Sequence, residues 1–187
     1  SANGGTMLFN AGSADITITS LAQAAGSASL IGGNLFLGDL VAGSSLDLLA
    51  DNQLIASNLN GGSIGFAAGI SGGSLNAGAG INLVSTGDLT IGDARAVGTL
   101  ALLGGAVQAG NLVSDADINV ESGSTITTGD ITAALGSVLI ANGLGTITTG
   151  VITAANDFTL DTGSDLVFAG VNVGDDIRIS SAGSMDI

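Results

Sequence analysis

The chain has 187 residues, a net charge of −14 at neutral pH and an apolar fraction of 45%. Its 16 acidic residues against Arg95 and Arg178 repel phosphate backbones and anionic lipid, so we predict no nucleic-acid partner and no direct membrane insertion. Cys is absent, which excludes a disulfide framework and a thiolate site, and we predict no cofactor.

The first residues, Ser1 to Ala11, have no basic segment ahead of an apolar run, so they do not form an intact secretory signal. No apolar run in the chain approaches the length that spans a membrane. We therefore expect any targeting segment to lie outside this sequence.

Apolar residues recur with a period of about nineteen residues, which predicts a repeat architecture. Polar residues such as Asp47, Asn82 and Arg178 stand between paired apolar positions, and this alternation predicts a strand with one inward face, although Leu8 and Leu139 are exceptions. The first apolar anchor of each repeat is Met7, Ala28, Leu46, Ile64, Ile81, Leu100, Ile118, Val138, Phe158 or Ile177. The residue two positions later is Phe9, Leu30, Leu48, Phe66, Leu83, Leu102, Val120, Ile140, Leu160 or Ile179.

Two further apolar columns follow within each repeat, and they predict a second and a third strand. The second-strand column is Ile16, Leu35, Leu54, Ile70, Leu89, Val107, Ile126, Ile147, Leu166 and Met185. The third-strand column is Leu21, Leu40, Leu59, Leu75, Ala94, Leu112, Ile131, Ile152 and Val171, with Ala94 its weakest member.

The clearest single repeat runs from Asp117 to Ala133 and offers three short strands with no helix between them. Its corners at Gly123 and Gly129 are too brief for a helical crossover. Repeats of this length bury an apolar face only by stacking. The sequence therefore predicts an all-β fold, a right-handed parallel β-helix of ten coils with about nineteen residues and three short strands per coil, forming one domain over residues 1–187.

Glycine is abundant at the predicted corners. One group lies five residues after the anchors, where we expect a sharp bend with positive φ: Gly12, Gly33, Gly69, Gly105, Gly123, Gly143 and Gly163. A second group precedes the third-strand anchors by two: Gly38, Gly73, Gly110, Gly129 and Gly150.

Motifs such as Thr86-Gly87-Asp88-Leu89-Thr90-Ile91 and Thr128-Gly129-Asp130-Ile131-Thr132-Ala133 resemble the repeats of filamentous-haemagglutinin-type exoproteins. The resemblance extends from Met7 to Ile187. It implies a right-handed β-helical shaft, export through two-partner secretion or as an autotransporter passenger, and a role in adhesion or biofilm formation at the bacterial cell surface. It carries over no receptor-binding residue.

The residue before each third-strand anchor is acidic or a short polar residue in most repeats: Ser20, Asp39, Asn58, Ser74, Asp93, Asn111 and Asp130. Carboxylate oxygens suit calcium, so Asp39, Asp93 and Asp130 are the candidate calcium ligands. Short polar side chains also bond to local backbone at turns, and we favour this structural interpretation.

Two further hypotheses concern surface chemistry. Asp157, Asp175 and Asp176 come together in adjacent coils, as the acid and base of a polysaccharide-active enzyme would. The chain has no His or Lys for proton transfer and only five Phe to form an aromatic platform for a sugar, so we do not favour this hypothesis.

Ice binding would need a regular array of Thr side chains on stacked coils. Thr125-Ile126-Thr127 and Thr146-Ile147-Thr148 form such an array over two coils only.

The favoured function is the shaft of an extracellular adhesin or matrix fibre, with no enzymatic activity. The expected partners are adjacent coils of the same longer polypeptide or fibre, a surface glycan, or other copies through self-association. Met7 already lies in a running repeat, and Ile187 follows soon after Met185, so we expect both ends to continue into further coils.

Overall fold

The computed structural model describes residues 5–20, 22–61 and 63–186, with side chains left undescribed at positions 51, 52, 56, 58 and 63–72. Within these ranges the regular structure consists of strands that belong to one 22-stranded parallel sheet. This part of the chain also contains no helix that is long and apolar enough to cross a membrane. The predicted all-β class is confirmed.

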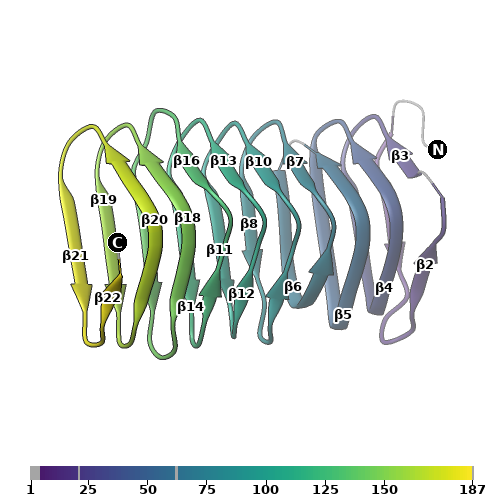
Figure 1. The fold of residues 1–187 in the computed structure, drawn as a ribbon. Coiled ribbons are helices and arrows are strands. Elements are labelled where there is room, and N and C mark those ends of the chain that lie inside the picture. Colours follow the sequence, from purple (N-terminus) through teal and green to yellow (C-terminus); the bar gives the residue numbers. More distant parts are fainter. Residues whose placement is uncertain (1–4, 21, 62, 187) are drawn as a thin grey trace.

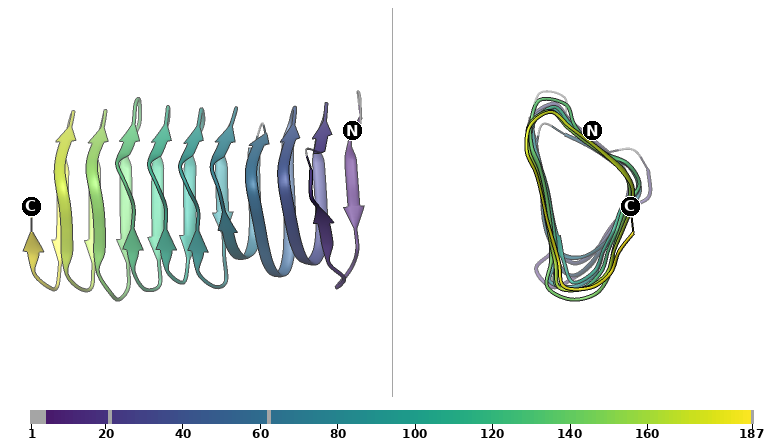
Figure 2. Two further views of the ribbon diagram at one scale, coloured as in Figure 1. Left: turned by 45° about the vertical axis from the view of Figure 1, so that its right-hand side comes forward. Right: turned by 60° about the vertical axis from the view of Figure 1, so that its left-hand side comes forward.

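The strands wind into a rod with a triangular cross-section, shown along its length in Figure 1 and from its end in Figure 2. Strands on the nearer side of Figure 1, such as β18 (Ile147–Ala154) and β20 (Leu166–Val173), run upward, and those behind run downward as the chain advances from right to left. The winding is therefore right-handed, as predicted. Nine complete turns are followed by two strands of a tenth.

We name the three walls of the rod the first, second and third faces, after the order of the strands in each coil. The first face contains β1 (Met7–Asn10), β8 (Ile81–Val84), β11 (Leu100–Gly104), β14 (Ile118–Ser122), β17 (Val138–Asn142), β19 (Phe158–Thr162) and β21 (Ile177–Ser181). The second contains β2 (Ile16–Ile18), β9 (Leu89–Thr90), β12 (Val107–Gln108), β15 (Ile126–Thr127) and β22 (Met185–Asp186). The third contains β3 (Ala22–Ala24), β7 (Leu75–Ala77), β10 (Ala94–Ala96), β13 (Leu112–Ser114) and β16 (Ile131–Ala133).

Some strands continue around a corner, so the predicted division into three short strands is not uniform. β4 (Ala28–Ala42) and β5 (Ser45–Gly61) each follow all three faces, β6 (Ser63–Gly72) follows the first two, and β18 and β20 follow the second and third. At the corners of these coils the backbone stays hydrogen-bonded to the neighbouring coil, so the strand continues from one face to the next. The pairing of β4 with β5 shifts in register between Gly32 and Asn34. The repeat length is unaffected.

The strand register confirms the predicted columns almost throughout. All ten anchors pair with one another from Met7↔Ala28 to Phe158↔Ile177. The second-strand column likewise pairs from Ile16↔Leu35 to Leu166↔Met185. The backbones of Ile64, Phe66 and Ile70 lie in these columns, but their side chains are outside the described part.

The third-strand column was predicted one residue out of register in the first coil. Ala22, not Leu21, pairs with Leu40. Leu21 itself lies outside the described residues. The corner before β3 therefore contains one more residue than the later repeats suggest, and a long aliphatic side chain in the sequence is a poor guide to register when a small one follows it. From Leu40 to Val171 the column is as predicted.

The core is a stack of aliphatic ladders inside the triangle. Ile118, Val120, Ile126 and Ile131 of the central coil have no exposed surface. Exposure rises toward the two ends of the rod, where Phe9 and Ile177 lie in the same columns but are about half exposed. Each inner side chain thus depends on the coils above and below it for its burial.

Substitution of Ile118 tests the inward columns. Ile118→Asp places an unpaired carboxylate between Leu100 and Val138, so we expect the free energy of unfolding to fall by about 3 kcal/mol or more. Asn119→Asp is the matched control, because Asn119 points outward from the next position of the same strand and should change stability by less than about 0.5 kcal/mol. Equal thermal midpoints for the two variants would contradict the assignment of the columns.

Candidate functional site

The acidic candidates lie at the corners, where the backbone has a specific hydrogen-bonding need. Gly110 and Asn111 both direct their N–H groups to the preceding coil, and the carbonyl of Gly92 accepts the first at 3.1 Å. The carbonyl of Asp93 cannot accept the second, because it points away from Asn111 to the coil on the opposite side, where it accepts the N–H of Leu75 at 2.8 Å. A corner N–H would therefore lose its partner if only backbone groups were available.

The side chain of the corner residue supplies the acceptor. Asp93 Oδ1 accepts the N–H of Asn111 at 2.8 Å, and Asn111 Oδ1 accepts the N–H of Asp130 at 2.9 Å. Asp130 Oδ1 then accepts the N–H of Val151 at 2.8 Å. We call such a series a corner ladder. The bonds to the carboxylates of Asp93 and Asp130 are charge-assisted and therefore stronger than bonds between neutral groups, and every bond of the series joins two coils.

Corner ladders also form at the other two corners. Before the second face, Asp88 Oδ1 accepts the N–H of Ala106 at 3.0 Å, and Asp165 Oδ1 accepts the N–H of Ser184 at 2.8 Å. Before the first face, Asp117 Oδ1 accepts the N–H of Ser137 at 2.9 Å. The sequence predicted hydrogen bonds from short polar side chains to the backbone only at the corner before the third face. The structure shows such bonds at all three corners.

The three candidate calcium ligands, which we interpreted as turn residues, are separated along the rod. Asp39 lies in the second coil, Asp93 in the fifth and Asp130 in the seventh. Coils are ~4.8 Å apart, so neighbours in this set stand about 10 Å or more from one another, whereas calcium binds oxygen at about 2.4 Å. The structure therefore does not bring these three carboxylates together around one ion.

Glycine precedes many corner residues because the corner ladder needs space. A Cβ added at Gly129 would collide with Asn111 Oδ1, and one added at Gly150 would collide with Asp130 Oδ1. The expectation of positive φ five residues after the anchors is confirmed for Gly12, with φ of 59°, and is wrong for Gly33, Gly105, Gly123, Gly143 and Gly163; the other described glycine with positive φ is Gly145. Close approach between coils, rather than an unusual backbone conformation, accounts for Gly129 and Gly150 at the corner before the third face.

Alanine substitution distinguishes these glycines. Gly150→Ala should displace the Asp130 side chain from its bond to Val151 and lower the free energy of unfolding by about 1–3 kcal/mol. Gly123→Ala is the control, because the nearest atom to its added Cβ is 3.8 Å away, and it should be neutral or slightly stabilising. Urea unfolding of both variants measures the difference, and a loss of stability in Gly123→Ala alone would be incompatible with the corner-ladder explanation.

One corner carboxylate has a shifted pKa. The backbone N–H of Ser184, followed by the Ser184 hydroxyl, donates to Asp165 and lowers the pKa of this carboxyl below its ordinary value of 3.8, against a small opposing effect of desolvation. Because the pKa of Asp165 is lower in the folded state than in the unfolded state, the ionised carboxylate stabilises the fold at pH values above the unfolded-state pKa. This stabilisation is lost as the pH falls through the folded-state pKa. At this corner the two bonds from Ser184 therefore favour the ionised form of Asp165.

The inner wall of one corner is polar, a feature the sequence analysis missed. Ser122, Asn142 and Thr162 stack in register on the inward side at the end of the first face. The Asn142 amide donates to the carbonyls of Ser124 at 2.8 Å and Gly145 at 2.7 Å, while its Oδ1 has no hydrogen-bond partner among the described residues. The signal was a polar residue four positions after successive anchors, and these side chains fix the turns that follow.

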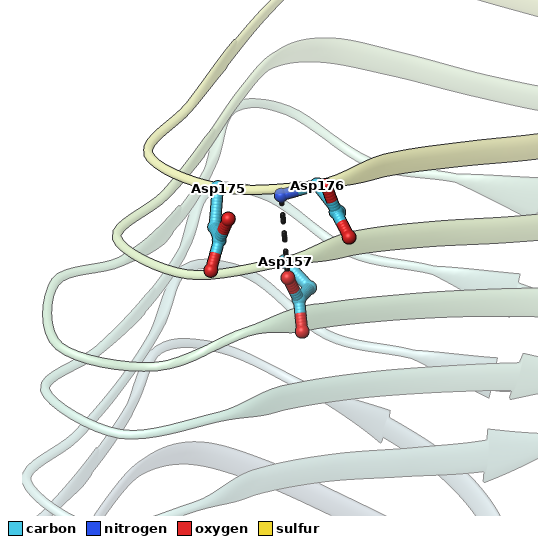
Figure 3. Close-up of side chains that lie close together, drawn as sticks. All are labelled: Asp157, Asp175 and Asp176. Carbon is cyan, nitrogen blue, oxygen red and sulfur yellow. Dashed lines mark hydrogen bonds between the residues drawn. The ribbon is translucent and has the colours of Figure 1, made fainter.

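The structure brings Asp157, Asp175 and Asp176 together, as predicted, with carboxylate oxygens within 4.8 Å of one another (Figure 3). All three side chains are exposed. Asp157 Oδ1 accepts the N–H of Asp176 at 3.3 Å, so this pair is one more step of a corner ladder. A shallow depression beside Asp157 and Asp176 is lined also by Arg178.

The two Thr ranks lie side by side on the second face. Thr127 pairs with Thr148, and both side chains are exposed. The neighbouring positions along the column are Gln108 on one side and Val167 on the other. The regular Thr array therefore ends after two coils, as predicted.

No protein-family model, curated protein or solved structure matches this chain. The fold and the corner ladders are thus established from the geometry of the chain itself. The resemblance to filamentous-haemagglutinin-type exoproteins stays a prediction about its family.

Metal removal tests the calcium hypothesis directly. Because the corner carboxylates already accept backbone N–H groups, EDTA should leave the thermal midpoint unchanged within about 1 °C, and added calcium should not raise it. Asp130→Asn serves as the companion variant, since Asn111 shows that an amide oxygen fills the same role. A calcium-dependent rise that Asp130→Asn abolishes would instead make Asp130 a ligand.

Proposed function

We propose that this chain is a segment of the shaft of a secreted or cell-surface bacterial adhesin or extracellular matrix fibre. The observation that carries the proposal is the unbroken inter-coil pairing from β1 to β22, reinforced by corner ladders at all three edges. Groups that would otherwise suggest chemistry, such as Asp93 and Asp130, are used to join coils. The role is to maintain length and to present other modules.

The rod geometry suits this role. Each coil adds ~4.8 Å of length, so the ten coils extend over about 45 Å. Three hydrogen-bonded walls enclose an aliphatic core, and the corners tie the walls to one another. Such a body resists bending and can be lengthened by adding repeats without changing its cross-section.

In the proposed role, further coils of the same polypeptide or fibre cover the half-exposed Phe9 and Ile177. Placement outside the cell follows the family resemblance, and the acidic surface favours solubility there. Contacts with a surface glycan belong to other modules or to an outward face of the rod.

Deletion of whole repeats tests the shaft role. In the parent polypeptide displayed on bacteria, removal of residues 118–137 joins Asp117 to Val138 and should shorten the rod by ~4.8 Å while adhesion is retained. Removal of residues 118–127 alone breaks the register and should abolish both folding and adhesion. Loss of adhesion after the whole-repeat deletion, with folding intact, would mean that this coil carries a binding site.

Polysaccharide degradation is the alternative outcome. The arrangement of Asp157, Asp176 and Arg178 around one depression is the observation that favours an enzyme. The shaft proposal expects no turnover of acidic or neutral polysaccharides by the purified chain. Turnover that disappears in Asp157→Asn and Asp176→Asn would replace the shaft proposal with a β-helical hydrolase or lyase.

A further inference from the structure

An apolar stripe lies on the outward side of the first face in the second, third, fifth and sixth coils. The register places Ile31 beside Leu49 and Val84 beside Leu103, and the backbone of Ala67 in β6 pairs with both Leu49 and Val84. Leu49 and Leu103 are each 42% exposed, and Ile31 and Val84 are partly exposed. Two pairs of partly exposed aliphatic side chains in one outward column of a chain with a net charge of −14 indicate an interaction site.

The stripe has polar ends. Asn10 occupies the same column in the first coil and Glu121 occupies it in the seventh. Two residues before the stripe on the same strands, a second outward column contains Asp47 in the third coil and Asn82 in the fifth. The stripe is therefore nearly symmetric about the fourth coil in its apolar residues, but not in its charge.

We propose that the first face binds a second copy of this chain in an antiparallel orientation, related by a two-fold axis through the fourth coil. This orientation packs Ile31 against Leu103 of the copy and Leu49 against Val84. The inference goes beyond the shaft role, because a shaft of isolated rods needs no lateral contact.

Charge selects the antiparallel orientation. In it, Asp47 of each rod faces Asn82 of the other, so a carboxylate meets an amide that can donate to it. Glu121 faces Asn10. A parallel arrangement with stripe against stripe would instead place Glu121 opposite Glu121, and like charges in an interface are unfavourable.

The size of the contact sets its strength. Seven coils overlap in this arrangement, over about 34 Å, and five-residue strands are about 16 Å wide, which gives roughly 500 Å² per partner. A stable interface typically needs about 800 Å² per partner. We therefore expect a reversible dimer that forms at high local concentration, as between rods crowded in a fibre or on a cell surface.

Sedimentation velocity over a range of protein concentrations tests the dimer. The net charge of −14 opposes association, so the dimer fraction should rise with salt as this repulsion is screened. Leu103→Lys should weaken dimerisation about tenfold or more, because it places a charge against Ile31. Val167→Lys is the matched control: Val167 is 40% exposed but lies on the second face, and its substitution should not weaken the dimer.

A gain-of-affinity variant tests the orientation without relying on a loss. Asn82→Arg should strengthen the dimer about tenfold by pairing with Asp47 of the copy. Asn119→Arg adds the same charge to the same outward column two coils away, where the facing residue is Leu8, and should have a smaller effect.

Three results would overturn the proposal. They are a monomer at all concentrations and salt levels, equal effects of Leu103→Lys and Val167→Lys, or equal effects of the two arginine substitutions. Association that grows beyond dimers and is insensitive to Leu103→Lys would point to end-to-end contacts instead. None of these results affects the whole-repeat deletion experiment, so the shaft role and the lateral contact are tested separately.

Discussion

The structure depends on pairing the backbone N–H groups where the chain turns between faces. Along a flat wall, parallel ladder bonds satisfy each strand from both sides. At a corner two successive N–H groups point to the same neighbouring coil, as at Gly110 and Asn111, and only one backbone carbonyl is free to accept. A short side chain with an oxygen at the δ position fills the gap and also joins one coil to the next.

This constraint explains much of the composition. Nine of the 16 acidic residues stand directly before a strand anchor: Asp15, Asp39, Asp88, Asp93, Asp117, Asp130, Asp157, Asp165 and Asp176. Alternation with Asn, Ser or an aliphatic residue, as at Asn111 and Ser137, spaces the carboxylates along the edges, with Asp157 and Asp176 as the exception. Much of the net charge is therefore a consequence of how the corners are built, and it needs no ligand to account for it.

The same constraint affects how the acidic clusters are interpreted. Asp157 and Asp176 approach each other because they occupy equivalent corners of adjacent coils, and one bonds to the backbone of the other. Their proximity follows from the repeat alone. The aliphatic stripe on the first face is different, since outward positions of a solenoid are free to be polar and most of them are. A shaft with one adhesive side would combine stiffness along the rod with reversible contact between rods.

The sequence by itself determined the repeat, the three inward columns and the inventory of corner residues. The period-two alternation around Ile118 and the nineteen-residue spacing can both be read from the sequence, and the same pattern recurs in every coil. Because each coil pairs with its neighbours, coils with a weak anchor, such as those containing Ala28 and Ala94, are also in register. A column is hard to misplace when nine other repeats constrain it. The one misplaced column position, Leu21, falls in the first coil, where the corner before Ala22 contains one more residue than the later corners do.

The tertiary structure alone decided what the corners do. Whether Gly150 is needed for positive φ or for space depends on an oxygen of Asp130 that is about one repeat away in sequence, and no local pattern specifies that contact. The direction of each corner N–H and the merging of strands in β4 and β5 likewise depend on how coils stack, as does the placement of Asp47 and Asn82 in one column on either side of the fourth coil. Inward burial follows from periodicity within a strand, whereas corner chemistry and surface contacts follow from distances between coils, which the sequence does not encode locally.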